Sequence, residues 1–71
     1  MKEERYSKVI TRKGRKYRYD YKDCYLQWVD KEGEIVDEIG LHRENWENRD
    51  TRNEYIDGWR AEIDEELAYM F

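Results

Sequence analysis

One segment of the sequence has residue types and a spacing that could bind a polyanion. From Arg12 to Lys22 it reads RKGRKYRYDYK, with six Lys or Arg residues and three tyrosines set two apart. Lysine and arginine neutralise phosphates and release counterions, while tyrosine rings stack on unpaired bases at about 1–3 kcal/mol each. We therefore expect single-stranded nucleic acid as a ligand, held by Arg12, Lys13, Arg15, Lys16, Tyr17, Arg18, Tyr19, Tyr21 and Lys22.

The remainder of the chain carries the opposite charge. Residues 1–22 hold nine Lys and Arg against three Asp and Glu, a net of +6, whereas residues 23–71 hold five against fifteen, a net of −10. The sum is −4, so a near-balanced chain contains two opposed halves. The candidate acidic surface consists of Asp57, Asp64 and Glu65. Such a surface could occupy a basic groove of a nucleic-acid-processing enzyme, as small acidic inhibitors from phages and mobile elements do, with carboxylates in place of phosphates.

Two questions about these surfaces stay open at the level of sequence. The three tyrosines share one face of a strand, and that face either is exposed to a ligand or forms the core beneath a helix. If it forms the core, the basic residues remain available for phosphates or are neutralised by the acidic half of the chain. A third alternative is a homodimer through the C-terminal helix, whose end, LAYMF, is apolar.

The residues needed for catalysis are sparse. The chain has one histidine, His42, and one cysteine, Cys24. It has no glycine-rich phosphate loop, and its carboxylates match no metal-binding spacing. We expect a protein that is not an enzyme, with no catalytic residues, no metal and no cofactor.

Length and composition indicate one small folded domain. A chain of 71 residues buries only ~60% of the surface that its unfolded form exposes, so its core is thin. Eleven aromatic residues nevertheless argue against disorder, and a single cysteine excludes an internal disulfide. No apolar run approaches the ~18 residues of a membrane span, and the N-terminus shows no signal-peptide pattern. We expect a soluble cytoplasmic protein that does not bind membranes.

The hydrophobic pattern predicts an α+β fold, a four-stranded antiparallel meander followed by a C-terminal amphipathic helix on one sheet face. Residues 5–12 and 15–22 form a basic β-hairpin around Lys13-Gly14, and residues 24–39 form an acidic hairpin with strands 24–29 and 34–39. Whether residues 20–23 turn the chain or continue a bent strand stays open. The helical region is 43–70, as one helix or with a short separate first helix, and a capping box, TRNE, is expected at 51–54. Its core-facing stripe is Ile56, Trp59, Ile63, Leu67 and Met70.

The order of several short motifs resembles a known family. RYSKVITRKGR, then QWVDKEGE, then IGLHRENW, together within about residues 5–47, resemble the single-stranded-DNA-binding domain of the transcriptional positive cofactor family. The resemblance implies four strands, a helix-mediated dimer and unpaired DNA bound by Arg12, Lys13, Arg15, Lys16, Tyr17 and Arg18. The chain departs from the family in a longer segment before Trp28 and in a longer, more acidic helix.

Overall fold

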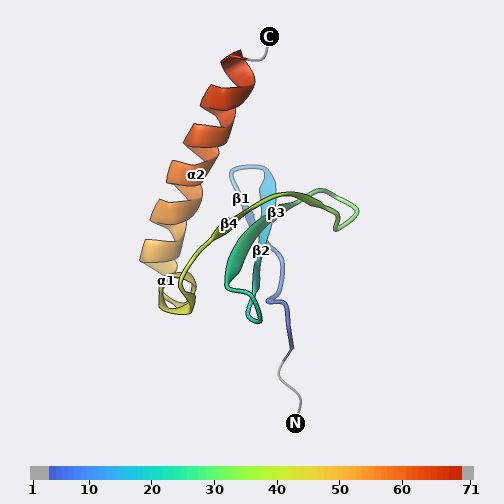
Figure 1. Cartoon of the computed structure of the whole chain (residues 1–71), viewed down its shortest axis with the longest axis vertical. Coiled ribbons are helices and arrows are strands. Elements are labelled where there is room, and N and C mark those ends of the chain that lie inside the picture. The colour runs from blue at the N-terminus through green and yellow to red at the C-terminus, as the bar shows by residue number, and fades with distance from the viewer. Residues whose placement is uncertain (1–3, 70–71) are drawn as a thin grey trace.

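The computed structural model describes residues 4–69 and contains one antiparallel sheet followed by two helices (Figure 1). The elements are β1 (Ile10–Arg12), β2 (Arg15–Asp20), β3 (Tyr25–Val29), β4 (Ile35–Gly40), α1 (Arg43–Glu47) and α2 (Arg49–Tyr69). The strand order in the sheet is the order in the chain, so β1 and β4 are its two edges. The α+β meander with a C-terminal helix is thereby confirmed. Within residues 4–69, no helix has the length and apolarity to cross a membrane.

The first strand is interrupted. Regular pairing covers only Ile10–Arg12, although residues 5–7 continue beside the end of β2 through a bridge between Tyr6 and Asp20. Paired residue numbers sum to 27 in β1 and to 26 at this bridge, so the N-terminal strand contains one extra residue, as in a β-bulge. The Ser7 hydroxyl accepts a hydrogen bond from the Tyr19 amide at 2.8 Å, which satisfies a donor next to the irregularity.

Two tight turns set the hairpins. Lys13 and Gly14 both have positive φ, 49° and 82°, as a two-residue type I′ turn requires. Residues 20–23, left open by the sequence, turn the chain. There the buried carboxylate of Asp20 accepts hydrogen bonds through Oδ1 from the amides of Lys22, at 2.9 Å, and Asp23, at 3.3 Å. Arg5 binds the same carboxylate from the N-terminal segment, with Nη2 to Oδ2 at 3.0 Å.

The helical region is divided at Asn48. Its side-chain Oδ1 accepts the amide hydrogen of Thr51 at 3.0 Å, the geometry of an N-cap for α2. The alternative of a single helix from residue 43 is therefore excluded. The predicted capping box was wrong, because residues 51–54 lie inside α2. The amide of Thr51, which the side chain of Glu54 would bind in such a box, already donates to Asn48.

The core lies between α2 and the face of the sheet that carries Tyr17, Tyr19 and Leu26. From the predicted stripe, α2 contributes the buried residues Ile56, Trp59 and Ile63. Leu67 is 40% exposed because the helix continues past the end of the sheet, as Figure 1 shows, and Met70 lies outside the described residues. Trp46 of α1 closes the core by stacking on Tyr19, with ring centroids 5.4 Å apart.

Candidate binding surfaces

The tyrosine face is part of the core. Tyr17 and Tyr19 are 1% and 0% exposed, so the expectation that they stack on nucleic-acid bases was wrong, and of the two orientations left open the helix-covered one is observed. Burial of a face with large rings removes more apolar surface from water than burial of the opposite face, which bears Lys16 and Arg18. Tyr21 is half-buried, with its ring edge-on to Tyr19 at 5.2 Å.

Half of the basic side chains in the segment are paired with α2. Arg12 donates two hydrogen bonds to Asp57, Nε to Oδ1 at 2.8 Å and Nη2 to Oδ2 at 2.7 Å, and Lys13 Nζ lies 3.6 Å from the same carboxylate. Arg15 donates to Asp64 Oδ1 at 2.6 Å. The hydrogen bonds and charge of Arg12 lower the pKa of Asp57 to about 2. Asp57 and Asp64 were expected to face a partner, and instead they neutralise the basic hairpin within the same chain.

The other basic residues lie on or near the outer face of the sheet. Lys16 pairs with Val29 in the strand register and is exposed, as is Lys22 in the following turn. Neither forms an ion pair with another residue in the described range 4–69. Arg18 lies over the ring of Tyr6, 4.1 Å from its centroid, and donates to Gln27 Oε1 at 2.8 Å. This face therefore keeps some positive charge.

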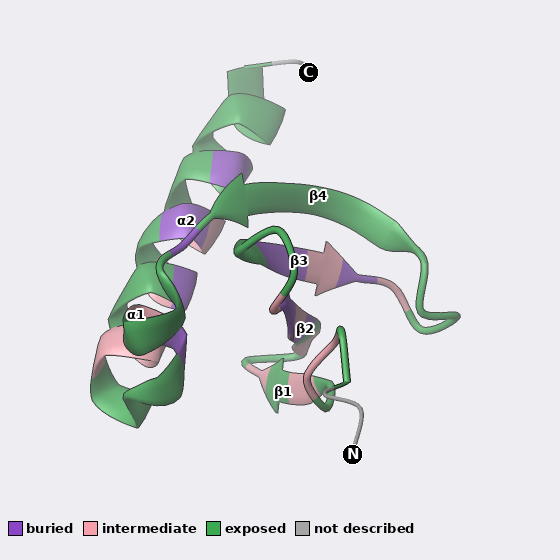
Figure 2. Cartoon of the chain, turned by 60° about the horizontal axis from the view of Figure 1, so that its bottom comes forward, coloured by how far each residue is buried: buried purple, intermediate pink, exposed green. Residues whose placement is uncertain are grey.

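The edge strand β4 is the largest uncovered element of the sheet. All six of its residues are exposed, and Figure 2 shows the whole strand in the colour of exposed residues above the buried parts of β2 and β3. Three of them are aliphatic, with exposed fractions of 44% for Ile35, 50% for Val36 and 38% for Ile39. The cause is the position of α2, which its ion pairs fix over the opposite hairpin, so that its apolar stripe covers β2 and β3.

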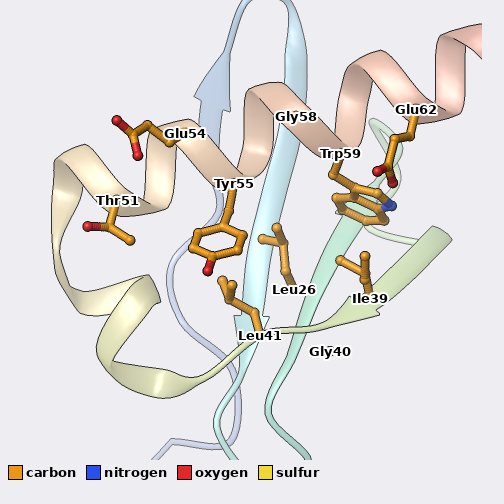
Figure 3. A pocket seen from close by; sticks show the side chains of 10 residues that line it. All are labelled: Leu26, Ile39, Gly40, Leu41, Thr51, Glu54, Tyr55, Gly58, Trp59 and Glu62. Atoms are coloured by element: carbon orange, nitrogen blue, oxygen red, sulfur yellow. The ribbon is translucent and has the colours of Figure 1, made fainter.

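A groove separates β4 from α2. We call it the β4–α2 groove; it has a volume of about 530 Å³ and is lined by Leu26, Ile39, Gly40, Leu41, Thr51, Glu54, Tyr55, Gly58, Trp59 and Glu62. In Figure 3 the rings of Tyr55 and Trp59 reach from the helix towards Leu41 and Ile39, with an open space between them. A side chain at Gly58 would meet no atom within 4 Å, which shows that this part of the helix faces open space.

The charge of the groove is one-sided. Glu54, Gly58 and Glu62 follow each other at intervals of four residues, so they lie along one line of α2. Glu54 and Glu62 are the charged residues of the lining, and no Lys, Arg or His of the part of the chain that the structure describes lies in it. The sequence alone did not predict this groove. The residues that could have indicated the groove are Tyr55 and Gly58, which lie beside the core-facing stripe of α2.

The described residues do not form a metal site. Among residues 4–69, no three His, Cys, Asp or Glu side chains lie together as a metal site. Cys24 is exposed at the β2–β3 turn with a positive φ of 58°.

Comparisons with known proteins give no relative. No family model, no curated protein and no solved structure matches the chain. The resemblance to the transcriptional positive cofactor family therefore stays a prediction from the residues alone.

Proposed function

We propose that this chain is a non-enzymatic binding protein that recognises a basic segment of a partner protein through β4 and the β4–α2 groove. The observation that carries the proposal is the composition of the groove. Its floor and walls are apolar, through Leu26, Tyr55 and Trp59, and within residues 4–69 the charges of its lining are the carboxylates of Glu54 and Glu62. Apolar clefts with a few placed polar groups are the usual form of binding sites.

The charge balance explains why the partner is basic. Asp57 and Asp64 use the positive charge of the hairpin, whereas Asp37, Glu38, Glu54 and Glu62 form no ion pair with any residue of the described range. A one-sided field of this kind attracts a cationic partner and speeds the encounter. The acidic partner surface expected from the sequence thus moves from Asp57, Asp64 and Glu65 to the groove and β4.

The test compares two charge reversals of equal size. Glu62→Lys changes the groove, whereas Glu32→Lys changes an exposed carboxylate in the β3–β4 loop. Immobilised wild type and both variants are incubated with extract of the native cell, and each retained protein is then purified and titrated separately. We expect a basic partner that binds wild type and Glu32→Lys alike, weakens with salt, and binds Glu62→Lys at least about tenfold more weakly. Equal binding to all three proteins would contradict the proposal.

Single-stranded nucleic acid is a second candidate, on the outer face of the sheet. It is favoured by the exposed Lys16 and Lys22, which form no ion pair among the described residues, and by Arg18, which lies over Tyr6. The measurement is fluorescence anisotropy of a labelled strand of about 20 nucleotides at low and moderate salt. Under the leading proposal the strand does not bind at moderate salt. Micromolar binding, weakened together with its salt slope by Lys16→Ala and Lys22→Ala, would favour the second candidate instead.

A further inference from the structure

The free edge of β4 specifies how a partner would bind. We infer that the occupant of the β4–α2 groove is an extended segment of a partner protein that adds to β4 as a fifth strand. The backbone of this segment forms hydrogen bonds with the backbone of Glu38 and Gly40. Its side chains alternate between two rows. One row is apolar and enters the groove, and the other row carries Lys or Arg. This inference rests on the proposed function and deepens it.

The hydrogen-bond pattern identifies the free backbone groups. The amide of Leu41 donates to the carbonyl of Cys24 at 2.9 Å, which makes these two residues a hydrogen-bonded pair next to the end of β4. In an antiparallel ladder such pairs alternate with non-bonded ones. By the register of β3 and β4, Ile39 therefore turns its backbone groups towards β3, whereas Glu38 and Gly40 turn theirs to the free edge.

The amide of Glu38 supports this assignment. It donates to Asp37 Oδ1 at 2.8 Å, a contact with the preceding side chain, not with β3. An edge amide without a strand partner needs a substitute acceptor, and a flexible carboxylate supplies one in the free protein. The donor becomes available to an incoming strand when the Asp37 side chain rotates away.

The position of the groove explains why one row of side chains on the added strand would be apolar. Ile39 pairs with Leu26 in the register, so both side chains lie on the sheet face that α2 covers. A fifth strand would lie about 4.8 Å beyond β4, and every second side chain on it would point to that same face. There it would meet the groove walls formed by Tyr55 and Trp59. Strand addition would also bury the exposed aliphatic side chain of Ile39.

The charges of β4 select a partner segment over a second copy of this chain. Glu34, Asp37 and Glu38 lie within five residues. Two copies of β4 paired antiparallel about their middle would place these carboxylates opposite one another, and like charges opposite each other destabilise a sheet. A row of Lys or Arg on the face of Glu38 reverses the sign of that interaction, and Glu54 and Glu62, on the opposite face, attract the same cationic segment through their longer-range field.

The test uses synthetic peptides with a built-in control. The probe is a fluorescein-labelled peptide of about nine residues that alternates Lys and Val, long enough to lie along β4. The same peptide is made with Glu in place of Lys, and in two N-methylated forms, one methylated at the Val amides and one at the Lys amides. In an added strand only one of these sets of amides faces β4, while the other faces solvent. We expect one N-methylated form to lose binding about tenfold or more and the other to keep it.

Protein variants and NMR give the second readout. Glu38→Pro removes the edge amide without touching the β3 ladder, and Glu38→Gln is its control for charge. Folding of both is checked by thermal unfolding, and if the proline variant does not fold, the N-methylated peptides decide. We expect the Lys–Val peptide to shift the amides of Glu38 and Gly40. The Glu–Val peptide should bind at least about tenfold more weakly.

Each other outcome overturns the inference in a distinct way. Equal binding of both N-methylated peptides means that a basic segment binds without strand addition, which leaves the proposed function intact. No binding of the Lys–Val peptide at about 1 mM overturns strand addition, and the capture experiment with Glu62→Lys then decides the proposed function separately. Shifts of Glu38 and Gly40 that depend on protein concentration without peptide would identify a second copy as the occupant.

Discussion

Arg12 and Asp57, 45 residues apart, form a two-point ion pair that joins the β1–β2 hairpin to the middle of α2. Arg60 strengthens the same junction by donating to the carbonyl of Lys13 at 2.6 Å. These contacts fix α2 over β2 and β3, so β4 is left without a covering helix. The pairing that removes positive charge from the hairpin thus also creates the uncovered surface.

The first prediction concerns the acid stability of this junction. Arg12 lowers the pKa of Asp57 from its usual 3.8 to about 2 in the folded protein. A carboxyl with a depressed folded-state pKa contributes stability that is fully present above its unfolded pKa and is lost as the pH falls through its folded pKa. We therefore expect wild type to exceed Asp57→Asn in stability at neutral pH, with a difference that shrinks between about pH 4 and pH 2.

The measurement is urea unfolding of both proteins at several pH values. Glu65→Gln is the matched control, because Glu65 is an exposed carboxylate of the same helix without an ion pair in the described range. Its difference from wild type should stay small at every pH. A wild-type advantage over Asp57→Asn that does not change between pH 7 and pH 2 would show that the ion pair contributes no stability.

The second prediction separates the two buried tyrosines. The hydroxyl of Tyr19 donates to the carbonyl of Leu41 at 2.6 Å, and burial raises the pKa of Tyr19. The hydroxyl of Tyr17 is equally buried but has no hydrogen-bond partner among the described residues. Tyr19→Phe should cost about 1–2 kcal/mol because it leaves a buried carbonyl unpaired, whereas Tyr17→Phe should be neutral or stabilising.

Thermal and urea unfolding of the two single variants check this prediction. Each substitution removes one oxygen atom from a ring in the same core, so packing losses are matched. Equal destabilisation by both would mean that the Tyr19–Leu41 hydrogen bond does not distinguish the two sites.

Local patterns in the sequence predicted most of the fold. The alternation predicted for residues 15–22, the turn at Gly14 and the spacing of Ile56, Trp59 and Ile63 follow from backbone geometry alone. The turn and the spacing were found where expected, whereas β2 ends at Asp20, two residues before the predicted end, because the chain turns there. The errors concern the ends of elements and of packed faces, which the period of the side chains does not determine. Asn48 replaces the expected cap because α1 ends there, and Leu67 is exposed because the sheet is shorter than the helix.

The candidate site was harder to predict for a related reason. The sequence showed two charged surfaces, the basic hairpin and Asp57 with Asp64, and left open whether the acidic half of the chain neutralises the basic one; the ion pairs of Asp57 and Asp64 show that it does so in part. The alternation of side chains along the strand puts the tyrosines on one face of the sheet, but it does not determine which face the helix covers. The β4–α2 groove depends on that docking direction, because it forms only where the helix leaves the sheet uncovered.

The third prediction concerns the buried carboxylate of Asp20. It accepts hydrogen bonds from the amides of Lys22 and Asp23 and binds the guanidinium of Arg5, and these contacts lower its pKa. Asp20→Ala leaves two amides without their acceptor and removes one of the two carboxylates that bind Arg5, the other being Asp23, whereas Asp20→Asn keeps an oxygen for the amides. We expect Asp20→Ala to cost about 1–3 kcal/mol in urea unfolding and Asp20→Asn to cost less. Equal losses would assign the stability to Arg5, which Arg5→Ala then measures directly.

The last prediction uses two glycines in opposite situations. Gly14 has a φ of 82°, so Gly14→Ala should destabilise the protein by about 1 kcal/mol or more. Gly58 lies in α2 without a positive φ, and its added Cβ would meet nothing within 4 Å. Gly58→Ala should therefore stabilise the protein by about 0.5–1 kcal/mol, since alanine favours the helix.

The same position also tests the groove. Gly58→Leu should keep the helix but place a large side chain between Glu54 and Glu62, where a partner is proposed to approach. Leucine at Glu66, an exposed helical position outside the lining, is the control for added apolar surface. We expect Gly58→Leu to weaken binding of the Lys–Val peptide about tenfold and Glu66→Leu to leave it within about twofold. Unchanged binding by Gly58→Leu, with unfolding curves that show an intact fold, would mean that the helix wall of the groove does not contact the ligand.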